Sequence, residues 1–244
     1  GRFKLFLDRP VQGDIKTVTI RKSRSSSWFV LFSCDNVPKR EYLETDKSVG
    51  IDVGIESFCV DSDGNKFDNP KHYDSAKQLL RLRQRSLCRK IKGSNRRNKA
   101  RILVASAHEK VVNKRKDFLH KVSKYYVDNY KEIHVEDLNI KGMVKNRHLS
   151  EAISDVGWGT FFNFLSYKAE EAGRTVVKVP PYGTSQICSG CGEKVPKKLS
   201  ERTHCCPYCG LKIHRDENAA RNILMLSGRG HRPQASTFAL ADVV

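Results

Sequence analysis

The sequence has no apolar run that approaches the roughly 18 to 20 residues needed by a membrane-spanning helix. It also lacks the charged, then apolar, then small-residue prefix of a secretory signal peptide. We therefore expect an intracellular protein without a membrane partner, in the cytoplasm or nucleoid if the source is prokaryotic. Methionine is scarce, with two residues, and Gly1 stands where an initiator Met is expected. We accordingly expect a processed or shortened chain.

Acidic residues are also few, with 27 Asp and Glu against 45 Lys and Arg, which gives a net charge of +18 over 244 residues. An excess this large favours a polyanionic partner. The charge is concentrated, because residues 71–124 contain 18 basic and only three acidic residues. The apolar positions of that segment form no Trp-rich or Phe-rich face that could enter lipid. Nucleic acid is therefore favoured over a membrane surface.

Hydrophobic periodicity predicts an alternation of strands and helices, which is typical of an α/β protein with a mixed sheet. Residues 1–47 are expected to contain a β hairpin that belongs to a larger sheet. Residues 49–60 are expected to form one strand, followed by a turn at 63–65 and a second strand. The remaining elements are helices at 74–92, 95–129 and 158–172, and strands at 131–138 and 175–179.

Two CxxCG motifs span Cys188 to Gly192 and Cys206 to Gly210, with fourteen residues between Cys191 and Cys206. Four thiolates at two tight turns can close a tetrahedron around Zn²⁺, which predicts a zinc site formed by Cys188, Cys191, Cys206 and Cys209. With all four positions filled, this zinc would be structural and not hydrolytic. Disulfides are disfavoured in a chain without a signal peptide. Cys205, His204 and His214 remain alternative ligands.

Three acids are candidates for a second metal site. Asp52 lies in a strand on the face that it shares with two glycines, where absent side chains leave space for a metal and a phosphate. Glu136 ends another strand, and Asp216 opens a helix. Each has an ordinary alternative explanation, as a hydrogen-bonded structural acid, a strand-end acid or an N-cap. Together they match the arrangement by which an RNase H-like fold holds two Mg²⁺ ions for phosphodiester cleavage.

At these residues the sequence resembles the TnpB (OrfB) proteins encoded by insertion sequences, which are relatives of the type V CRISPR effectors and have a RuvC-type nuclease domain. The resemblance covers about residues 1–228. It rests on five ordered motifs, which are GIDVGI at 50–55, RKDFLHKVS at 115–123, VEDLNIKGMVKN at 135–146, SQICSGCG at 185–192, and CPYCG with HRDENAARNI at 206–223. The family usually has an acid at the position of His214, whereas the catalytic position, Asp216, is intact.

This resemblance implies an RNase H-like (RuvC) mixed sheet with flanking helices, an inserted zinc ribbon, and an N-terminal β remnant of a wedge-like barrel. The family normally has a helical recognition region inserted in that barrel, whereas residues 1–34 correspond only to its last strands. The implied domains are a partial wedge-like domain at 1–47, a nuclease core at 48–184 with a basic helical segment at 71–130, a zinc ribbon at 185–213, a final helix at 214–228 and a tail at 229–244.

The resemblance further implies RNA-guided cleavage of DNA, with DNA and a guide RNA as partners. Asp52, Glu136 and Asp216 would be the catalytic acids that bind Mg²⁺, and the zinc would be structural. Residue chemistry alone leaves two alternatives open. One is a nucleic-acid-binding accessory protein or repressor without cleavage, and the other is a DNA-joining transposase.

The nucleic-acid contacts are expected in the basic segment, and above all at Arg96, Arg97, Lys99 and Arg101. These four residues follow a Gly-Ser-Asn turn at the start of the long helix, where exposed amides can also meet phosphate. Repeated positive charge there opposes the helix dipole, which makes a purely structural reason for it less plausible. We expect them to bind the phosphate backbone without reading bases. For any single residue, a solvated charged face is the alternative.

Overall fold

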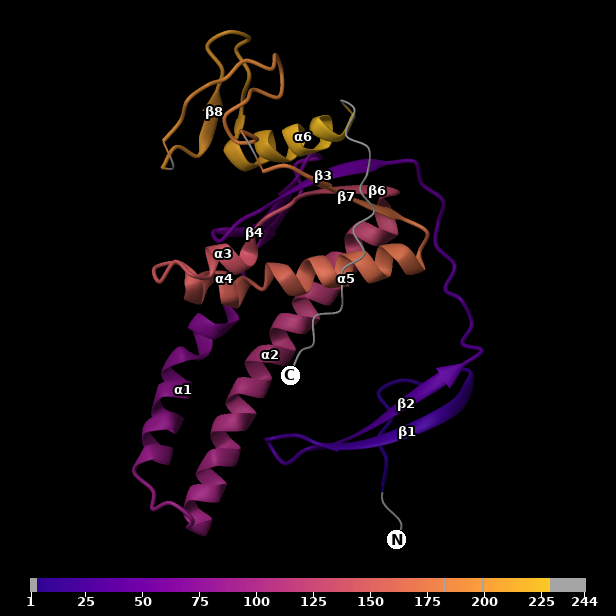
Figure 1. Cartoon of the computed structure of the whole chain (residues 1–244), viewed down its shortest axis with the longest axis vertical. Helices are drawn as coiled ribbons and strands as arrows, with labels where there is room; N and C mark the ends of the chain where they lie inside the picture. Colours follow the sequence, from indigo (N-terminus) through magenta and orange to yellow (C-terminus); the bar gives the residue numbers. More distant parts are fainter. Residues whose placement is uncertain (1–3, 182, 199, 229–244) are drawn as a thin grey trace. The chain divides into compact units, whose positions relative to one another are not determined.

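The protein is described here from a computed structural model, which covers residues 4–181, 183–198 and 200–228. The expected tail at 229–244 lies outside these described residues. The chain divides into two compact units, with boundaries at Glu41/Tyr42, Asp74/Ser75 and Val112/Asn113. Figure 1 shows the elements in chain order.

The first unit contains the expected β hairpin. Strand β1 (Asp14–Lys22) pairs antiparallel with β2 (Trp28–Asp35), with Lys22 opposite Trp28. The serine-rich connection is closed by a hydrogen bond of 2.8 Å from the Ser23 amide to the Ser27 carbonyl. The sequence therefore predicted the hairpin itself correctly, but the expectation of a larger sheet is wrong for the described residues, where β1 and β2 form a sheet of two strands.

The same unit contains most of a long helical hairpin built from α1 (His72–Cys88) and α2 (Asn95–Asn129). The first three residues of α1 and the residues of α2 from Asn113 onward belong to the second unit. Small and aliphatic side chains are buried along these helices, namely Leu80, Ala100, Val104, Ala107 and Val111. Gly93, with a φ of 85°, lies in the turn between the helices. The expected helices are confirmed, although α1 ends four residues earlier than the periodicity predicted.

The second unit is built around a five-stranded sheet with the order β5-β4-β3-β6-β7. Its strands are β3 (Ser48–Val53), β4 (Ser57–Asp61), β5 (Lys66–Asp68), β6 (Glu132–Glu136) and β7 (Thr175–Val179). The first three pair antiparallel, whereas β3, β6 and β7 run parallel, so the sheet is mixed as expected.

The prediction of a single strand over residues 49–60 is wrong. The chain reverses after Val53, and the Gly54 amide donates to the Phe58 carbonyl at 3.0 Å. Residues 49–60 contain no Pro, Asn-Gly or Asp-Gly, and apolar residues continue on both sides of Gly54, so the sequence pattern alone did not reveal the turn. The second strand expected after the turn at 63–65 is β5.

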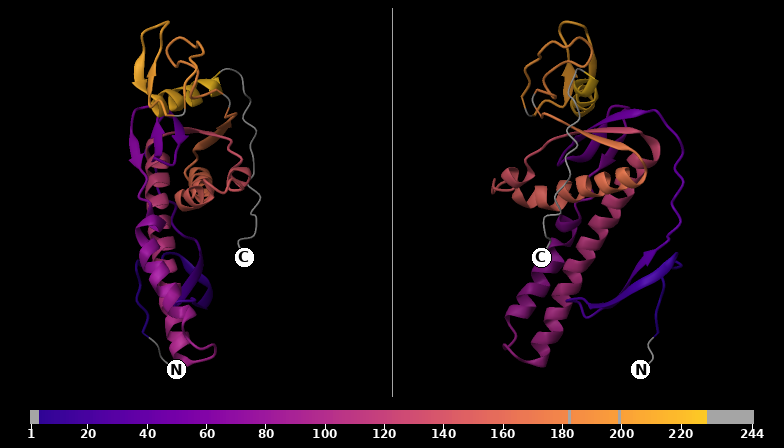
Figure 2. Two further views of the ribbon diagram at one scale, coloured as in Figure 1. Left: turned by 90° about the vertical axis from the view of Figure 1, so that its left-hand side faces the viewer. Right: turned by 45° about the vertical axis from the view of Figure 1, so that its right-hand side comes forward.

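One face of this sheet carries the main hydrophobic core. The C-terminal half of α2 and α5 (Trp158–Glu171) cover that face, as Figures 1 and 2 show. Phe58 is fully buried there and meets Phe118 and Phe161 edge-on, with ring centroids 5.0 and 5.1 Å apart. The core fixes which side chains of β3 and β6 point away from it.

The opposite face is covered by α6 (Arg215–Gly228). The helix lies directly on β3 because Gly50 has no side chain: a Cβ at this position would lie 2.1 Å from the Ala220 carbonyl oxygen. Ala220 and Ile223 of this helix are fully buried against the sheet. Asp216 therefore begins a helix that is docked on the sheet.

Two short helices, α3 (Ile140–Met143) and α4 (Ser150–Val156), were not anticipated. Asp155 of α4 accepts a hydrogen bond from Arg115 at 2.6 Å and from the Tyr73 amide at 3.0 Å. This carboxylate thus connects α4 with the start of α1 and the middle of α2. None of the helices in the described ranges combines the length and apolarity needed to cross a membrane.

Candidate functional site

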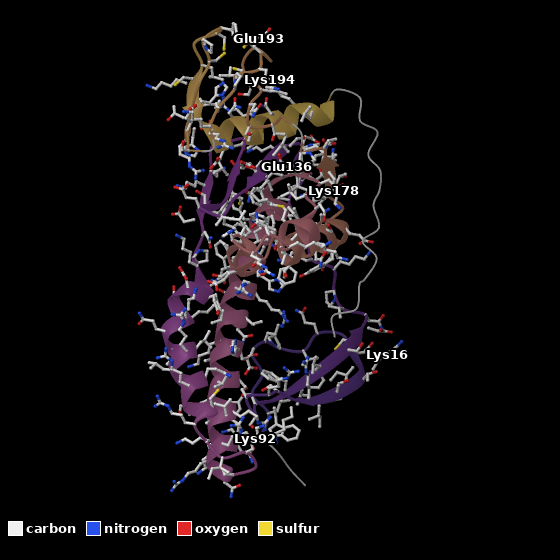
Figure 3. All side chains as sticks on the ribbon, turned by 60° about the vertical axis from the view of Figure 1, so that its left-hand side comes forward. Lys16, Lys92, Glu136, Lys178, Glu193 and Lys194 are labelled. Atoms are coloured by element: carbon white, nitrogen blue, oxygen red, sulfur yellow. The ribbon has the colours of Figure 1, made fainter. Side chains whose placement is uncertain are left out.

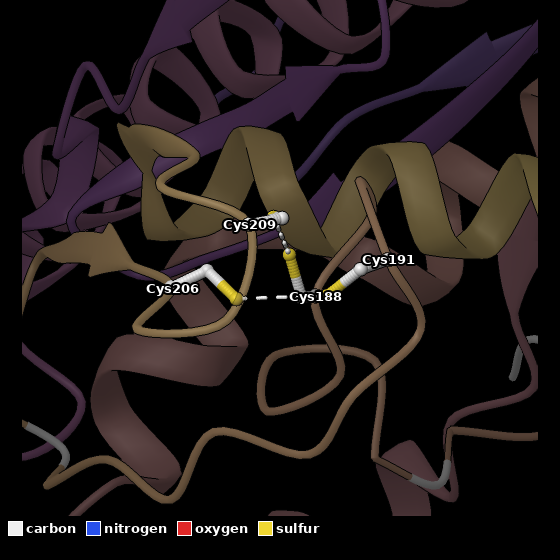
Figure 4. Close-up of side chains that lie close together, drawn as sticks. All are labelled: Cys188, Cys191, Cys206 and Cys209. Carbon is white, nitrogen blue, oxygen red and sulfur yellow. Dashed lines mark hydrogen bonds between the residues drawn. The ribbon is translucent and has the colours of Figure 1, made fainter.

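The four predicted zinc ligands lie together. Their sulfur atoms all lie within 4.8 Å of one another, and the Cys188–Cys209 and Cys191–Cys206 pairs are each separated by 3.6 Å (Figure 4). Four thiolates in a tetrahedron with Zn–S bonds of about 2.3 Å have sulfur atoms about 3.8 Å apart. The cluster therefore has the size of a ZnS₄ site. Within the described part of the chain, no other group of His, Cys, Asp and Glu side chains is this tight.

The backbone of each CxxCG motif curls around its sulfur atoms. Gly192 and Gly210 adopt φ values of 81° and 76°, and each donates its amide to the carbonyl of the first cysteine of its motif, at 2.9 and 3.0 Å. Burial raises the pKa of Cys206, but hydrogen bonds from the amides of Cys209 and Tyr208 and from the Cys188 and Cys191 side chains outweigh it and together lower the pKa to about 7. A thiolate at this position is the form that binds zinc.

The alternative zinc ligands do not join the cluster. His204 is fully buried inside the ribbon, where its Nδ1 contacts the Lys197 ammonium group. Burial lowers the pKa of His204, so the ring is neutral and serves packing. His214 accepts a hydrogen bond from the Asp216 amide at 3.3 Å, at the start of α6. The ribbon strands are β8 (Thr203–Cys205) and β9 (Lys212–His214).

Two buried asparagines fasten the first zinc motif to α6. Asn218 accepts from the Ser189 amide at 2.9 Å and donates to the Ile187 carbonyl at 2.7 Å. Asn222 donates to the carbonyls of Thr184 and Ile187, at 2.7 and 2.6 Å. Sequence reasoning missed both residues. Their spacing of four within an otherwise apolar helical stripe was the available signal, because residues four apart share a helix face.

The three candidate acids come from β3, β6 and α6. The parallel register places Ile51 beside Val135, so Asp52 and Glu136 follow at the same ends of neighbouring strands. Asp52 shares its face with Gly50, on which Ala220 lies, and Asp216 is one helical turn before Ala220. Figure 3 shows Glu136 at the end of β6, between the sheet and α6. The fold thus brings the three acids together at the carboxyl-terminal ends of β3 and β6.

The electrostatics of these acids reflect their proximity. Burial raises the pKa of Asp52 well above its ordinary value, and the negative charges of Glu136 and Asp216 raise it further, whereas Arg215 opposes them. The carboxylates are nevertheless less tightly clustered than the four cysteines. Mutual repulsion at a half-buried position is what a bound cation would relieve.

Glu136 has a specific hydrogen-bond donor. Burial raises the pKa of this carboxyl group, and a hydrogen bond of 2.7 Å from the Thr184 hydroxyl opposes that shift. Thr184 was not among the sequence candidates, since a threonine between a Gly and a Ser gives no distinctive signal.

The four basic candidates differ in their surroundings. Arg96, Lys99 and Arg101 are exposed on α2. Arg97 is half-buried and donates to the carbonyls of Leu87 and Lys90, at 3.0 and 2.9 Å. Its guanidinium group therefore closes the turn between α1 and α2, a structural role that the sequence did not reveal.

Comparison with known families identifies two matching regions. Residues 32–147 match the OrfB_IS605 family, described as "Probable transposase". Residues 158–223 match the family described as "Cas12f1-like, TNB domain". The two regions include all three acids and all four cysteines.

Curated relatives extend the similarity along most of the chain. A protein of Streptomyces pristinaespiralis named "Putative RNA-guided DNA endonuclease" is 38% identical over 92% of this chain and 58% of its own length. InsQ of Escherichia coli (strain K12), which has the same description, is 31% identical over 88% of this chain and 58% of its own length. The chain therefore spans a little over half the length of these relatives.

Among solved structures, Cas12f1 in a complex with sgRNA and target DNA is similar, with a TM-score of 0.51 and 20% identity. The similarity covers 85% of this chain and 55% of that one. At this identity the likeness supports the fold alone. The ordered family regions and the curated relatives together show that the chain belongs to the TnpB (OrfB) family, which is related to Cas12f1.

Proposed function

We propose that this chain contains the catalytic part of an RNA-guided DNA endonuclease, with an RNase H-like (RuvC) site that hydrolyses a phosphodiester bond of DNA with the help of Mg²⁺. The observation that carries the proposal is the proximity of Asp52, Glu136 and Asp216 at the carboxyl-terminal ends of β3 and β6. There the negative charges of Glu136 and Asp216 raise the pKa of Asp52.

The sheet supports the finer fold assignment. Strands β3, β4 and β5 are consecutive and antiparallel, and β6 and β7 extend the sheet in parallel on the other side of β3. Acids on the central strand, on its parallel neighbour and on a helix that crosses the sheet form the constellation expected of an RNase H-like nuclease.

The donor set suits a hard divalent cation. Carboxylate oxygens are the ligands that Mg²⁺ prefers, and Asp52, Glu136 and Asp216 would hold it. When bound, Mg²⁺ supplies a water of lowered pKa and neutralises charge on the phosphate. The chain's own residues hold the carboxylates in place: β3 and β6 fix Asp52 and Glu136 side by side, and the contact of α6 with Gly50 fixes Asp216.

The zinc site plays a structural part in this proposal. Four cysteine ligands leave no open position for a substrate. The ribbon has little apolar core of its own, so the metal would stabilise it, and Asn218 and Asn222 would transmit that order to the helix of Asp216. The proposed cofactors are therefore structural Zn²⁺ and catalytic Mg²⁺.

The proposed partners are DNA and a guide RNA, as the names of the relatives suggest. The net charge of +18 favours polyanions, and the exposed Arg96, Lys99 and Arg101 offer contacts to phosphate. These contacts and the domain limits given above are part of the proposal.

Cleavage of guide-matched DNA tests the function. RNA that copurifies with the protein is sequenced, and the complex is incubated with matching DNA in Mg²⁺ buffer. Asp52→Asn, Glu136→Gln and Asp216→Asn should each lower the cleavage rate at least about a hundredfold, because each removes a ligand needed in the transition state. Nucleic-acid binding should change little.

Asp137→Asn is the matched control, since this exposed acid follows Glu136 directly and pairs with Lys178 at the surface. Binding of RNA and DNA without cleavage by the unmodified complex would favour an accessory protein. Joined DNA strands as the product would favour a transposase.

A further inference from the structure

The loop between β7 and the zinc ribbon contains a threonine with two partners in different elements. Thr184 is almost fully buried, with 5% exposure. Its hydroxyl donates to Oε1 of Glu136 at 2.7 Å, and its carbonyl accepts from Asn222 of α6 at 2.7 Å. The side chain and the backbone of one residue thus connect the end of β6 with α6.

This geometry constrains the orientation of the Glu136 carboxylate. A hydroxyl hydrogen can be donated to only one acceptor, and here that acceptor is Oε1. A glutamate side chain has three rotatable bonds. The hydrogen bond restricts them in advance, so less conformational entropy is lost when the carboxylate binds a cation. The direction of the hydrogen bond also favours the ionised carboxylate, the form that can bind a cation.

We propose that Thr184 is a positioning residue that orients Glu136 toward a divalent cation in the site of the three acids. The proposal rests on the proposed function, because it needs that cation. Residues that orient a ligand in this way commonly change metal affinity by about 10- to 100-fold when they are replaced.

The surroundings show why a threonine at this position can act as a fixed support. Asn222 also donates to the Ile187 carbonyl, directly before Cys188, so the backbone on both sides of the loop is held to α6. The same helix carries Asp216. Thr184 therefore moves with the helix that supplies the third acid, and the donor to Glu136 keeps its place relative to that acid.

Binding of Mn²⁺, followed by the decline of the free-ion electron paramagnetic resonance signal, measures the effect without nucleic acid. Thr184→Val removes only the hydroxyl from a nearly isosteric side chain and leaves the carbonyl bonded to Asn222. We expect its Mn²⁺ dissociation constant to rise about tenfold. Thr184→Ser keeps a hydroxyl and should bind within about twofold of the unmodified protein.

Zinc content and Tm report a general effect on folding, and both should be unchanged in Thr184→Ser. Thr175→Val, which alters an exposed threonine of β7 in the same sheet, should leave the Mn²⁺ affinity unchanged.

The outcomes for the inference and for the proposed function differ. Asp52→Asn should abolish the Mn²⁺ binding, and equal binding by this variant and the unmodified protein would overturn the metal site itself. If Asp52→Asn loses the ion but Thr184→Val keeps the unmodified affinity, the positioning role is wrong and the metal site stands. If Thr184→Val does not fold, Thr184→Ser decides, because a tenfold loss of affinity in a folded serine variant contradicts the role of the hydroxyl.

Discussion

The contact between Gly50 and α6 makes a single-methyl substitution informative. In Gly50→Ala the new Cβ would lie 2.1 Å from the Ala220 carbonyl oxygen and 2.7 Å from the Leu224 amide nitrogen. Real Cβ atoms essentially never lie within 3.0 Å of such atoms, and both neighbours are backbone. No side-chain rotation can relieve the overlap. To restore an ordinary contact distance between the new Cβ and these backbone atoms, the helix must therefore move away from β3 by about 1 Å.

Two consequences of that movement can be given magnitudes. Overpacking of a close contact costs about 1–3 kcal/mol, only partly offset by the lower backbone entropy of alanine in the unfolded chain. For a chain of this size each 1 kcal/mol lowers Tm by about 2–4 °C. A constellation of metal ligands must be held within about 0.5 Å, so a movement of about 1 Å at Asp216 should weaken Mn²⁺ binding at least about tenfold.

Thermal unfolding and Mn²⁺ titration of Gly50→Ala check both consequences. Gly159→Ala is the matched control, because a Cβ there meets only the tip of Ile140 at 3.9 Å, and it should raise stability by up to about 0.5 kcal/mol. The zinc content of both variants should stay at one ion per chain. A Gly50→Ala variant with unchanged Tm and unchanged Mn²⁺ affinity would refute the inference that the absent side chain sets the position of the third acid.

Three further predictions concern zinc, charge and nucleic acid. Cys206→Ser should reduce bound zinc well below one ion per chain, measured by elemental analysis, and full retention would place the ligands elsewhere. The pKa of Asp52 is higher in the folded protein than in the unfolded chain. In Mg²⁺-free buffer, the free energy of unfolding therefore decreases as pH rises above the ordinary pKa of an Asp side chain. Asp52→Asn should therefore raise Tm by a few degrees at about pH 7, and the gain should shrink toward about pH 4; a gain independent of pH would contradict this account. Replacing Arg96, Lys99 and Arg101 with Gln should weaken DNA binding similarly for all sequences and reduce the salt slope by about 0.9 per lost contact, whereas an unchanged slope would place the DNA elsewhere.

Much of the fold was predictable because its elements are long or strongly patterned. The amphipathic α2 and the strand β7 were found from periodicity, and the zinc motifs from their spacing. The turn at Gly54 was missed because residues 49–60 contain no Pro, Asn-Gly or Asp-Gly that would mark it, and apolar residues continue on both sides of the glycine. The short helices α3 and α4 were missed because a helix of one or two turns shows no period.

The candidate site was predictable only as a list of residues. Motif resemblance indicated Asp52, Glu136 and Asp216, but their meeting depends on the parallel register of β3 with β6 and on the contact of α6 with Gly50. Those are long-range contacts, which local patterns do not specify. Thr184 was missed for the same reason, since its acceptor Glu136 is distant in sequence. The hydrogen bonds of Arg97 to Leu87 and Lys90 were missed because they depend on how the turn between α1 and α2 folds back on itself.

The dependence of the acid site on α6 has a consequence for synthesis of the protein. β3 and its Asp52 leave the ribosome well before α6, which is the last described element to emerge. At about 5–20 residues per second, β3 waits roughly ten to thirty seconds for the helix that covers Gly50 and supplies Asp216. A nascent chain therefore displays its basic helical hairpin long before it holds all three carboxylates. If the proposed chemistry is correct, an incompletely translated chain can occupy nucleic acid without the means to cut it.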